Sequence, residues 1–77
     1  MRRYYFDVHD STGFHRDEIG DEMQDFDEAR DQAQSLLPDI ARDQLPDGES
    51  HRVVCEVRDE TDRVVYRGTL TYEGTRL

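Results

Sequence analysis

The sequence predicts an α+β fold in which a small antiparallel sheet, in the order β-β-α-β-β, is covered on one face by a single amphipathic helix. Strand-like runs stand on both sides of one helical run, and the β-α-β repeat of a parallel sheet is missing from the pattern. The chain has 77 residues, and we expect residues 1–77 to form a single domain. A core of this size leaves little room for an enclosed substrate cavity.

The first third of the chain predicts two strands joined by a turn. Residues 3–10 (RYYFDVHD) carry apolar side chains at every second position, which is typical of a strand. Residues 10–13 (DSTG) provide turn residues that tolerate unusual backbone angles. A second, shorter strand is expected near residues 14–16, and it resumes around residues 22–23 after a polar bend at Gly20.

The start of the helix is the clearest local signal. Asp25 and Glu28 form a D-x-x-E capping box ahead of an apolar run with helical spacing. We expect one helix over residues 26–45, ended by the sequence PDG at residues 46–48. Pro38 removes one backbone hydrogen bond. Because the apolar stripe continues in phase beyond it, the helix should bend there without dividing in two.

Two further strands are expected after the helix. They cover residues 51–58 (HRVVCEVR) and 63–73 (RVVYRGTLTYE), and the sequence DETD between them predicts a hairpin turn. The residues after Glu73 predict a disordered tail. The alternation in all strands, with the helical stripe, predicts a core made of Tyr4, Phe6, Val8, Phe26, Ala29, Ala33, Leu36, Leu37, Ile40, Val53, Cys55, Val57, Val64, Tyr66 and Leu70.

The charge of the chain is strongly and locally acidic. The net charge is −9, every basic residue is an arginine, and residues 17–49 hold twelve acidic residues against two arginines. A negative charge of this size repels the phosphate backbone of nucleic acids, so we expect no direct binding to nucleic acid. It attracts a basic protein partner and speeds that encounter. The alternative explanation is that the acidity serves solubility or reflects a salty or GC-rich host.

The composition also bears on the compartment. A single cysteine, Cys55, excludes an internal disulfide and favours a reducing environment. The N-terminus has no apolar segment typical of a signal peptide, and no apolar run approaches the roughly 20 residues that span a bilayer. We therefore expect a cytoplasmic protein without a membrane partner.

His9, His15 and Asp17 are the candidates for a metal site, because they stand together in a segment rich in carboxylates. The two histidines lie across a turn, where a hairpin can bring them face to face. However, a metal site needs three or four converging ligands, and the alternation puts His9 on the face opposite the core. A solvated hairpin without a metal or cofactor is the favoured interpretation, and a metal-binding module is the alternative.

No catalytic residue is predicted. The sequence DSTG has one residue more than the D-[ST]-G motif of aspartic proteases, and no EF-hand loop, phosphate loop or zinc spacing is present. Cys55 lies about 13 Å along a strand from His51, which is too far for a nucleophile and its base. We expect a non-enzymatic protein.

Two surfaces are candidates for contacts with a protein partner. Asp27, Asp31, Asp39 and Asp43 share one row of the predicted helix with Ser35, and like charges at this spacing destabilise a helix. A partner-facing acidic row explains this cost, and a general need for solubility explains it as well. The last strand is long and close to the C-terminus. It predicts an open sheet edge and a homodimer formed through it.

The chain carries the pattern R-Y-[FY]-F-x-[VL], a turn with glycine, and then D-x-x-G-x-[EL]-x-D-x-x-x-A-R. The later sequence DETDRVVY is similar to D-x-x-G-R-V, with Asp62 in place of the glycine. In these motifs the chain resembles a family of short, uncharacterised proteobacterial proteins. Pro38 departs from the pattern. The matching positions are Arg3, Tyr4, Tyr5, Phe6, Val8, Gly13, Asp17, Gly20, Met23, Asp25, Ala29 and Arg30. This resemblance implies a fold but no activity and no catalytic residue.

The layout is also similar to the N-terminal domain of HicB-type antitoxins, with GDEMQDFDEARDQAQSLL as the counterpart stretch. That resemblance implies an inhibitor of a basic, RNA-cleaving toxin. Fold analogy does not establish function. The sequence thus predicts an uncharacterised non-enzymatic domain that acts through protein contacts by way of an acidic surface. An antitoxin-like inhibitor of a basic protein and a metal-binding module that uses His9 and His15 are the alternatives.

Overall fold

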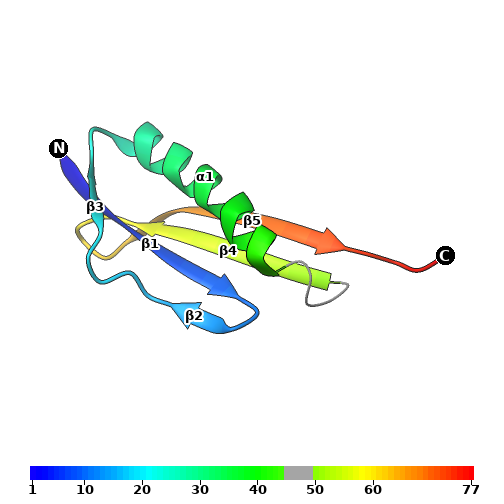
Figure 1. The fold of residues 1–77 in the computed structure, drawn as a ribbon. Helices are drawn as coiled ribbons and strands as arrows, with labels where there is room; N and C mark the ends of the chain where they lie inside the picture. The colour runs from blue at the N-terminus through cyan, green and yellow to red at the C-terminus, as the bar shows by residue number, and fades with distance from the viewer. Residues whose placement is uncertain (45–49) are drawn as a thin grey trace.

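The structure is a computed structural model that describes residues 1–44 and 50–77 (Figure 1). One helix and five strands confirm the predicted α+β fold. In chain order the elements are β1 (Arg2–Asp10), β2 (Gly13–His15), β3 (Asp21–Met23), α1 (Phe26–Gln44), β4 (Ser50–Arg58) and β5 (Val64–Glu73).

All strand pairs are antiparallel, and the sheet has the order β2-β1-β4-β5. The outer edge of β1 is shared by two short strands. β2 pairs with its C-terminal end and β3 pairs with its N-terminal end, at Arg2–Tyr4. The second strand therefore forms in two pieces, as predicted, and residues 16–20 pass beside the middle of β1.

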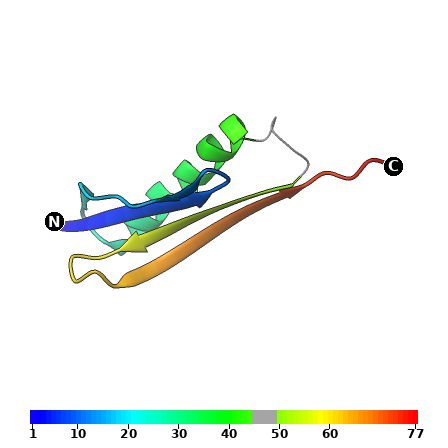
Figure 2. The ribbon, with the colours of Figure 1, turned by 90° about the horizontal axis from the view of Figure 1, so that it is seen from below.

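The helix α1 lies on one face of the sheet, as Figures 1 and 2 show. The Asp25 carboxylate accepts a hydrogen bond of 2.9 Å from the Glu28 N–H, which confirms the N-terminal cap. The helix continues through Pro38. The predicted last residue of the helix, 45, and the PDG sequence at 46–48 lie outside the described residues.

Four residues one helical turn apart attach α1 to the sheet: Ala29, Ala33, Leu37 and Ala41, all buried. Three alanines let the helix approach the strands closely. Gly68 on β5 contributes to this fit, because a Cβ atom there would lie 3.0 Å from Leu37 Cδ1. Across the sheet, Val53, Cys55 and Val57 of β4 are the largest fully buried side chains.

The predicted core is mostly confirmed, but Phe26 is only half-buried and lies outside the core cluster, and β5 requires two corrections. Val64 is 45% exposed because a register shift next to Val57 and Arg58 turns it to the opposite face, so that Val65 packs against the core instead. Leu70 lies on the helix side but is 39% exposed, since it belongs to the outermost strand. Met23 and Ala41 join the core without having been predicted.

The sheet face opposite α1 carries the alternate side chains of each strand, and in Figure 2 no other described helix or strand lies against that face. The molecule is elongated, with principal extents of 49 × 21 × 17 Å. Residues 74–77 follow β5 without regular secondary structure. Within the described part of the chain, no helix is long and apolar enough to cross a membrane.

Candidate functional site

A buried ion pair lies on the sheet face that α1 does not cover. Asp7 of β1 and Arg58 of β4 are 2% and 6% exposed. They are diagonal neighbours, since Tyr5 stands directly opposite Arg58. Arg58 Nε and Nη2 donate to the two carboxylate oxygens of Asp7 at 2.6 and 3.1 Å. This bidentate geometry is the strongest form of arginine–carboxylate pairing.

The loop of residues 16–20 covers this ion pair and closes the middle of β1. The Asp17 N–H donates to Asp7, and the Asp17 carbonyl oxygen accepts from Arg58 at 2.7 Å. The Asp17 carboxylate accepts from the N–H groups of Phe6, Ile19 and Gly20. Burial alone raises the pKa of this carboxyl, but these three hydrogen bonds and the charge of Arg58 lower it overall.

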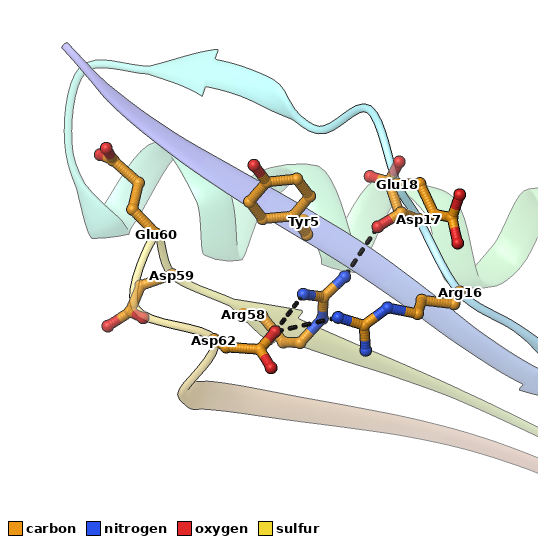
Figure 3. Close-up of a pocket in the computed structure, with 8 residues that line it drawn as sticks. All are labelled: Tyr5, Arg16, Asp17, Glu18, Arg58, Asp59, Glu60 and Asp62. Carbon is orange, nitrogen blue, oxygen red and sulfur yellow. Dashed lines mark hydrogen bonds and ion pairs between the residues drawn. The ribbon is translucent and has the colours of Figure 1, made fainter.

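The same cluster lines a hollow of about 370 Å³ on the surface (Figure 3). Asp62, from the turn between β4 and β5, accepts from both Arg58 and Arg16. The Tyr5 ring lies 4.8 Å from the Arg58 guanidinium carbon, within the range of a cation–π contact. The hydrogen bonds that Arg58 donates to Asp7 are the largest cause of the raised pKa of Arg58. Both arginines in this hollow are therefore already paired with carboxylates.

Asp62 also explains a detail of the family pattern. It has a backbone φ of 69°, the left-handed region that favours glycine. Hydrogen bonds from Arg58 and Arg16 lower the pKa of its carboxyl. The aspartate thus supplies a charge to the ion-pair cluster at a position where the turn itself favours glycine.

The structure does not bring the three metal candidates together. His15 pairs with Val8, so it lies on the helix side, where its Nε2 contacts Thr12 and Asp10. His9 lies on the opposite face, with Nε2 at 3.0 Å from Glu56. The Asp17 carboxylate binds backbone N–H groups at the edge of β1. No group of three His, Cys, Asp or Glu residues in the described part of the chain is placed to hold a metal ion.

Cys55 is fully buried in the core. Burial, with smaller contributions from the charges of Asp7 and Glu56, raises the pKa of its thiol to about 11. At neutral pH the side chain is therefore a neutral apolar group. This agrees with its predicted place in the core.

The acidic row of α1 points away from the sheet. Its four aspartates, Asp27, Asp31, Asp39 and Asp43, are all exposed. Arg30 lies 3.5 Å from two of them, and Arg42 lies 3.2 Å from a third. Exposed pairs of this kind contribute little stability, so the row remains a strongly acidic surface.

The direction of the backbone groups in β5 follows from the register. The Phe6 N–H donates away from β4, to Asp17, and the Arg3 N–H donates to the other side, to Glu60. The odd-numbered residues of β1 therefore direct their backbone N–H and C=O groups toward β4, and their partners on β4 are even-numbered. The odd-numbered residues of β4 then direct their N–H and C=O groups toward β5, where their partners are the even-numbered residues from Tyr66 to Tyr72.

The odd-numbered residues of β5 consequently point their N–H and C=O groups away from the sheet. These residues are Arg67, Thr69, Thr71 and Glu73. Within residues 1–44 and 50–77, β5 is the last strand of the sheet, and no hydrogen bond covers this outer edge. Beside it, on the helix side, Leu70 and Tyr72 are 39% and 46% exposed. The edge predicted from the sequence is therefore open.

Three buried polar residues were missed by sequence reasoning: Asp7, Arg58 and His51. The alternation correctly put Asp7 on the face away from the helix, but only the strand register and the covering loop bury it. His51 Nε2 has no hydrogen-bond partner among the described residues. Arg58 and the turn sequence DETD that follows it are visible as charged residues in the sequence. No pattern of neighbouring residues indicates that they lie close to Asp7 in the fold.

Comparison with known proteins agrees with the predicted resemblance to an uncharacterised family. The sequence profile of a family described as a domain of unknown function (DUF6894) matches residues 3–71, which include all of β2, β3, α1 and β4 and most of β1 and β5. Searches of curated proteins and of solved structures gave no match. The chain therefore belongs to the DUF6894 family, a family of unknown function.

Proposed function

We propose that this protein is a non-enzymatic interaction domain that binds an extended strand at the open edge of β5. The observation that carries the proposal is the contrast between the two edges of one sheet. An unpaired edge presents a row of N–H and C=O groups that another strand can complete, a mode known as β-augmentation.

The outer edge of β1 is closed by two short strands and one side chain. β2 and β3 pair with its two ends, and the Asp17 carboxylate takes the N–H of Phe6 between them. At β5 the described residues supply no such cover. The five residues from Gly68 to Tyr72 carry no charge and no proline, although charges and prolines are the usual means of blocking an edge.

Three reactive side chains, His9, His15 and Cys55, support a non-enzymatic role because each is hydrogen-bonded or buried. His9 is bonded to Glu56 and His15 to Thr12 and Asp10. Cys55 is buried with a raised thiol pKa. A nucleophile near a base, which covalent catalysis needs, does not occur in this arrangement of the described residues.

The test compares two proline substitutions in a tagged protein expressed in its host. Co-purifying proteins are identified, and the complex is rebuilt from purified components. Thr69→Pro removes an N–H that points away from the sheet, whereas Leu70→Pro removes one that bonds to β4. We expect Thr69→Pro to fold, by circular dichroism, and to weaken partner binding at least tenfold. Leu70→Pro should unfold.

The acidic row of α1 is the competing surface, and the antitoxin-like alternative depends on it. A variant with Asp27, Asp31, Asp39 and Asp43 all changed to Asn removes four charges from the exposed side of the helix. If this variant loses the partner while Thr69→Pro keeps it, the edge proposal is wrong and a basic partner on the helix takes its place. Strong weakening of the complex by salt would accompany that result.

A further inference from the structure

We infer that the strand bound at the β5 edge is β5 of a second copy of this chain, in a two-fold antiparallel pairing centred on Leu70. The inference rests on the proposed function, since it names the partner of the same edge. Symmetric homodimers are the commonest oligomers, and a two-fold interface requires a surface that complements itself. The sequence of β5 has that property in one register.

The charges on the strand select the register. With Leu70 opposite Leu70 of the second copy, Arg67 stands directly opposite Glu73 of the second copy, and the symmetry repeats this pair. Opposite charges at directly opposed positions stabilise a sheet, and like charges there destabilise it. Both side chains lie on the face away from α1, since Arg67 stands opposite Glu56 and Glu73 stands opposite Ser50 in β4. Because the Arg67 guanidinium already binds Glu56 within the chain, Glu73 of the second copy would join an existing ion pair.

The hydrogen-bonding groups agree with this register. Arg67, Thr69, Thr71 and Glu73 point outward, so they must face outward-pointing residues of the second copy. Centred on Leu70, Thr69 faces Thr71 of the second copy and Arg67 faces Glu73. Threonine pairs across strands are favourable. Each of these opposed pairs can exchange two backbone hydrogen bonds.

The apolar side chains agree as well. On the helix side, Tyr72 of one copy lies opposite Gly68 of the other, where its aromatic ring would extend the apolar cover that Leu37 already gives this glycine. The two copies of Leu70 meet on the two-fold axis. Leu70 and Tyr72, which are 39% and 46% exposed in the single chain, would both be buried. This explains why two large side chains are exposed beside an uncharged edge.

Neighbouring registers lose these matches. Moving the centre by one residue, to Thr69 or Thr71, leaves Arg67 and Glu73 each opposite an uncharged residue. Moving it to Arg67 or Glu73 puts like charges opposite each other, which is unfavourable. The Leu70 register pairs both charges with opposite partners.

The test measures the oligomeric state and the register separately. Sedimentation equilibrium of the full chain should show a dimer for the wild type, and a dissociation constant at least tenfold weaker for Thr69→Pro with the helix and strand content unchanged. Three cysteine variants, Thr69→Cys, Leu70→Cys and Thr71→Cys, are then oxidised under mild conditions. Only Leu70→Cys should form a covalent dimer.

The geometry explains the expected pattern. Opposed residues of a non-hydrogen-bonded pair have Cα atoms about 4.5 Å apart, within the range that a disulfide spans. Position 69 lies diagonal to position 69 of the second copy, roughly 7–8 Å away, and the same holds for position 71. The wild type is the control for Cys55, which is fully buried.

The outcomes separate this inference from the proposed function. A wild type that stays monomeric at millimolar concentration, or a dimer that cross-links through position 69 or 71 and not through 70, overturns the inference. If a different protein then binds and Thr69→Pro releases it, the edge proposal stands without self-pairing. If Thr69→Pro changes neither self-association nor partner binding, both proposals fall.

Discussion

Replacing Arg58 with Met should destabilise the domain far more than any surface change of the same size. Arg58 donates to Asp7, to the Asp17 carbonyl oxygen and to Asp62. Methionine fills much of the same volume but leaves the Asp7 carboxylate buried without its counter-charge. Removing one partner of a buried ion pair costs about 3–5 kcal/mol.

This loss is large relative to the stability of so small a domain. At about 0.05–0.15 kcal/mol per residue, a 77-residue chain has a free energy of unfolding of roughly 4–12 kcal/mol. Urea denaturation at pH 7, followed by circular dichroism, measures the change. Arg42→Met is the matched control, because its pair with Asp39 is exposed. It should cost less than about 1 kcal/mol.

A double variant tests the reasoning even where Arg58→Met is too unstable to measure well. Adding Asp7→Asn removes the uncompensated charge, and the new amide still accepts a hydrogen bond from the Asp17 N–H. Arg58→Met with Asp7→Asn should therefore be more stable than Arg58→Met alone. Two results would refute the stabilising role of the buried ion pair. One is a decrease in the free energy of unfolding for Arg58→Met no greater than that for Arg42→Met. The other is strictly additive effects of Arg58→Met and Asp7→Asn on that free energy.

Three further outcomes follow from single residues. Gly20→Ala should lower the free energy of unfolding by at least about 1–2 kcal/mol. The reason is that φ at Gly20 is 73° and a Cβ atom there would lie 2.9 Å from the Tyr4 carbonyl oxygen. An unchanged midpoint of urea denaturation would contradict this. Cys55, with a thiol pKa of about 11, should resist alkylation at pH 8 in the native protein and react quickly in urea. Hydrogen bonds from Thr12 are the largest cause that lowers the pKa of Asp10 to about 2, so its contribution to stability is full above about pH 4 and is lost as the pH falls toward 2. The stability difference between wild type and Asp10→Asn should shrink over that interval, and a constant difference would exclude this role.

Most of the fold was predictable because its signals are local. Alternation along β1 and β4, the cap at Asp25 and the turn before Arg63 each depend on neighbours in the sequence. The misplacement of Val64 has a non-local cause. A register shift opposite Val57 and Arg58 turns it outward, and alternation alone carries no information on where a strand gains one residue.

The polar cluster was less predictable for the same reason. Asp7 and Arg58 are far apart in the chain, and they meet only because β1 and β4 pair in one particular register. The metal hypothesis shows the reverse case. His9 and His15 are close in sequence, but their opposed neighbours, Phe14 and Val8, put them on opposite faces of the sheet.

The closed edge at β1 and the open edge at β5 have a joint consequence for assembly. A sheet with two open edges can add strands without limit, which leads to fibres. The proposed two-fold pairing through β5 would use the open edge of both copies at once, and the remaining edges would be those protected by β2, β3 and Asp17. A net charge of −9 on each copy opposes further stacking. If β5 pairs as proposed, the two edges together would therefore favour an assembly that stops at two chains.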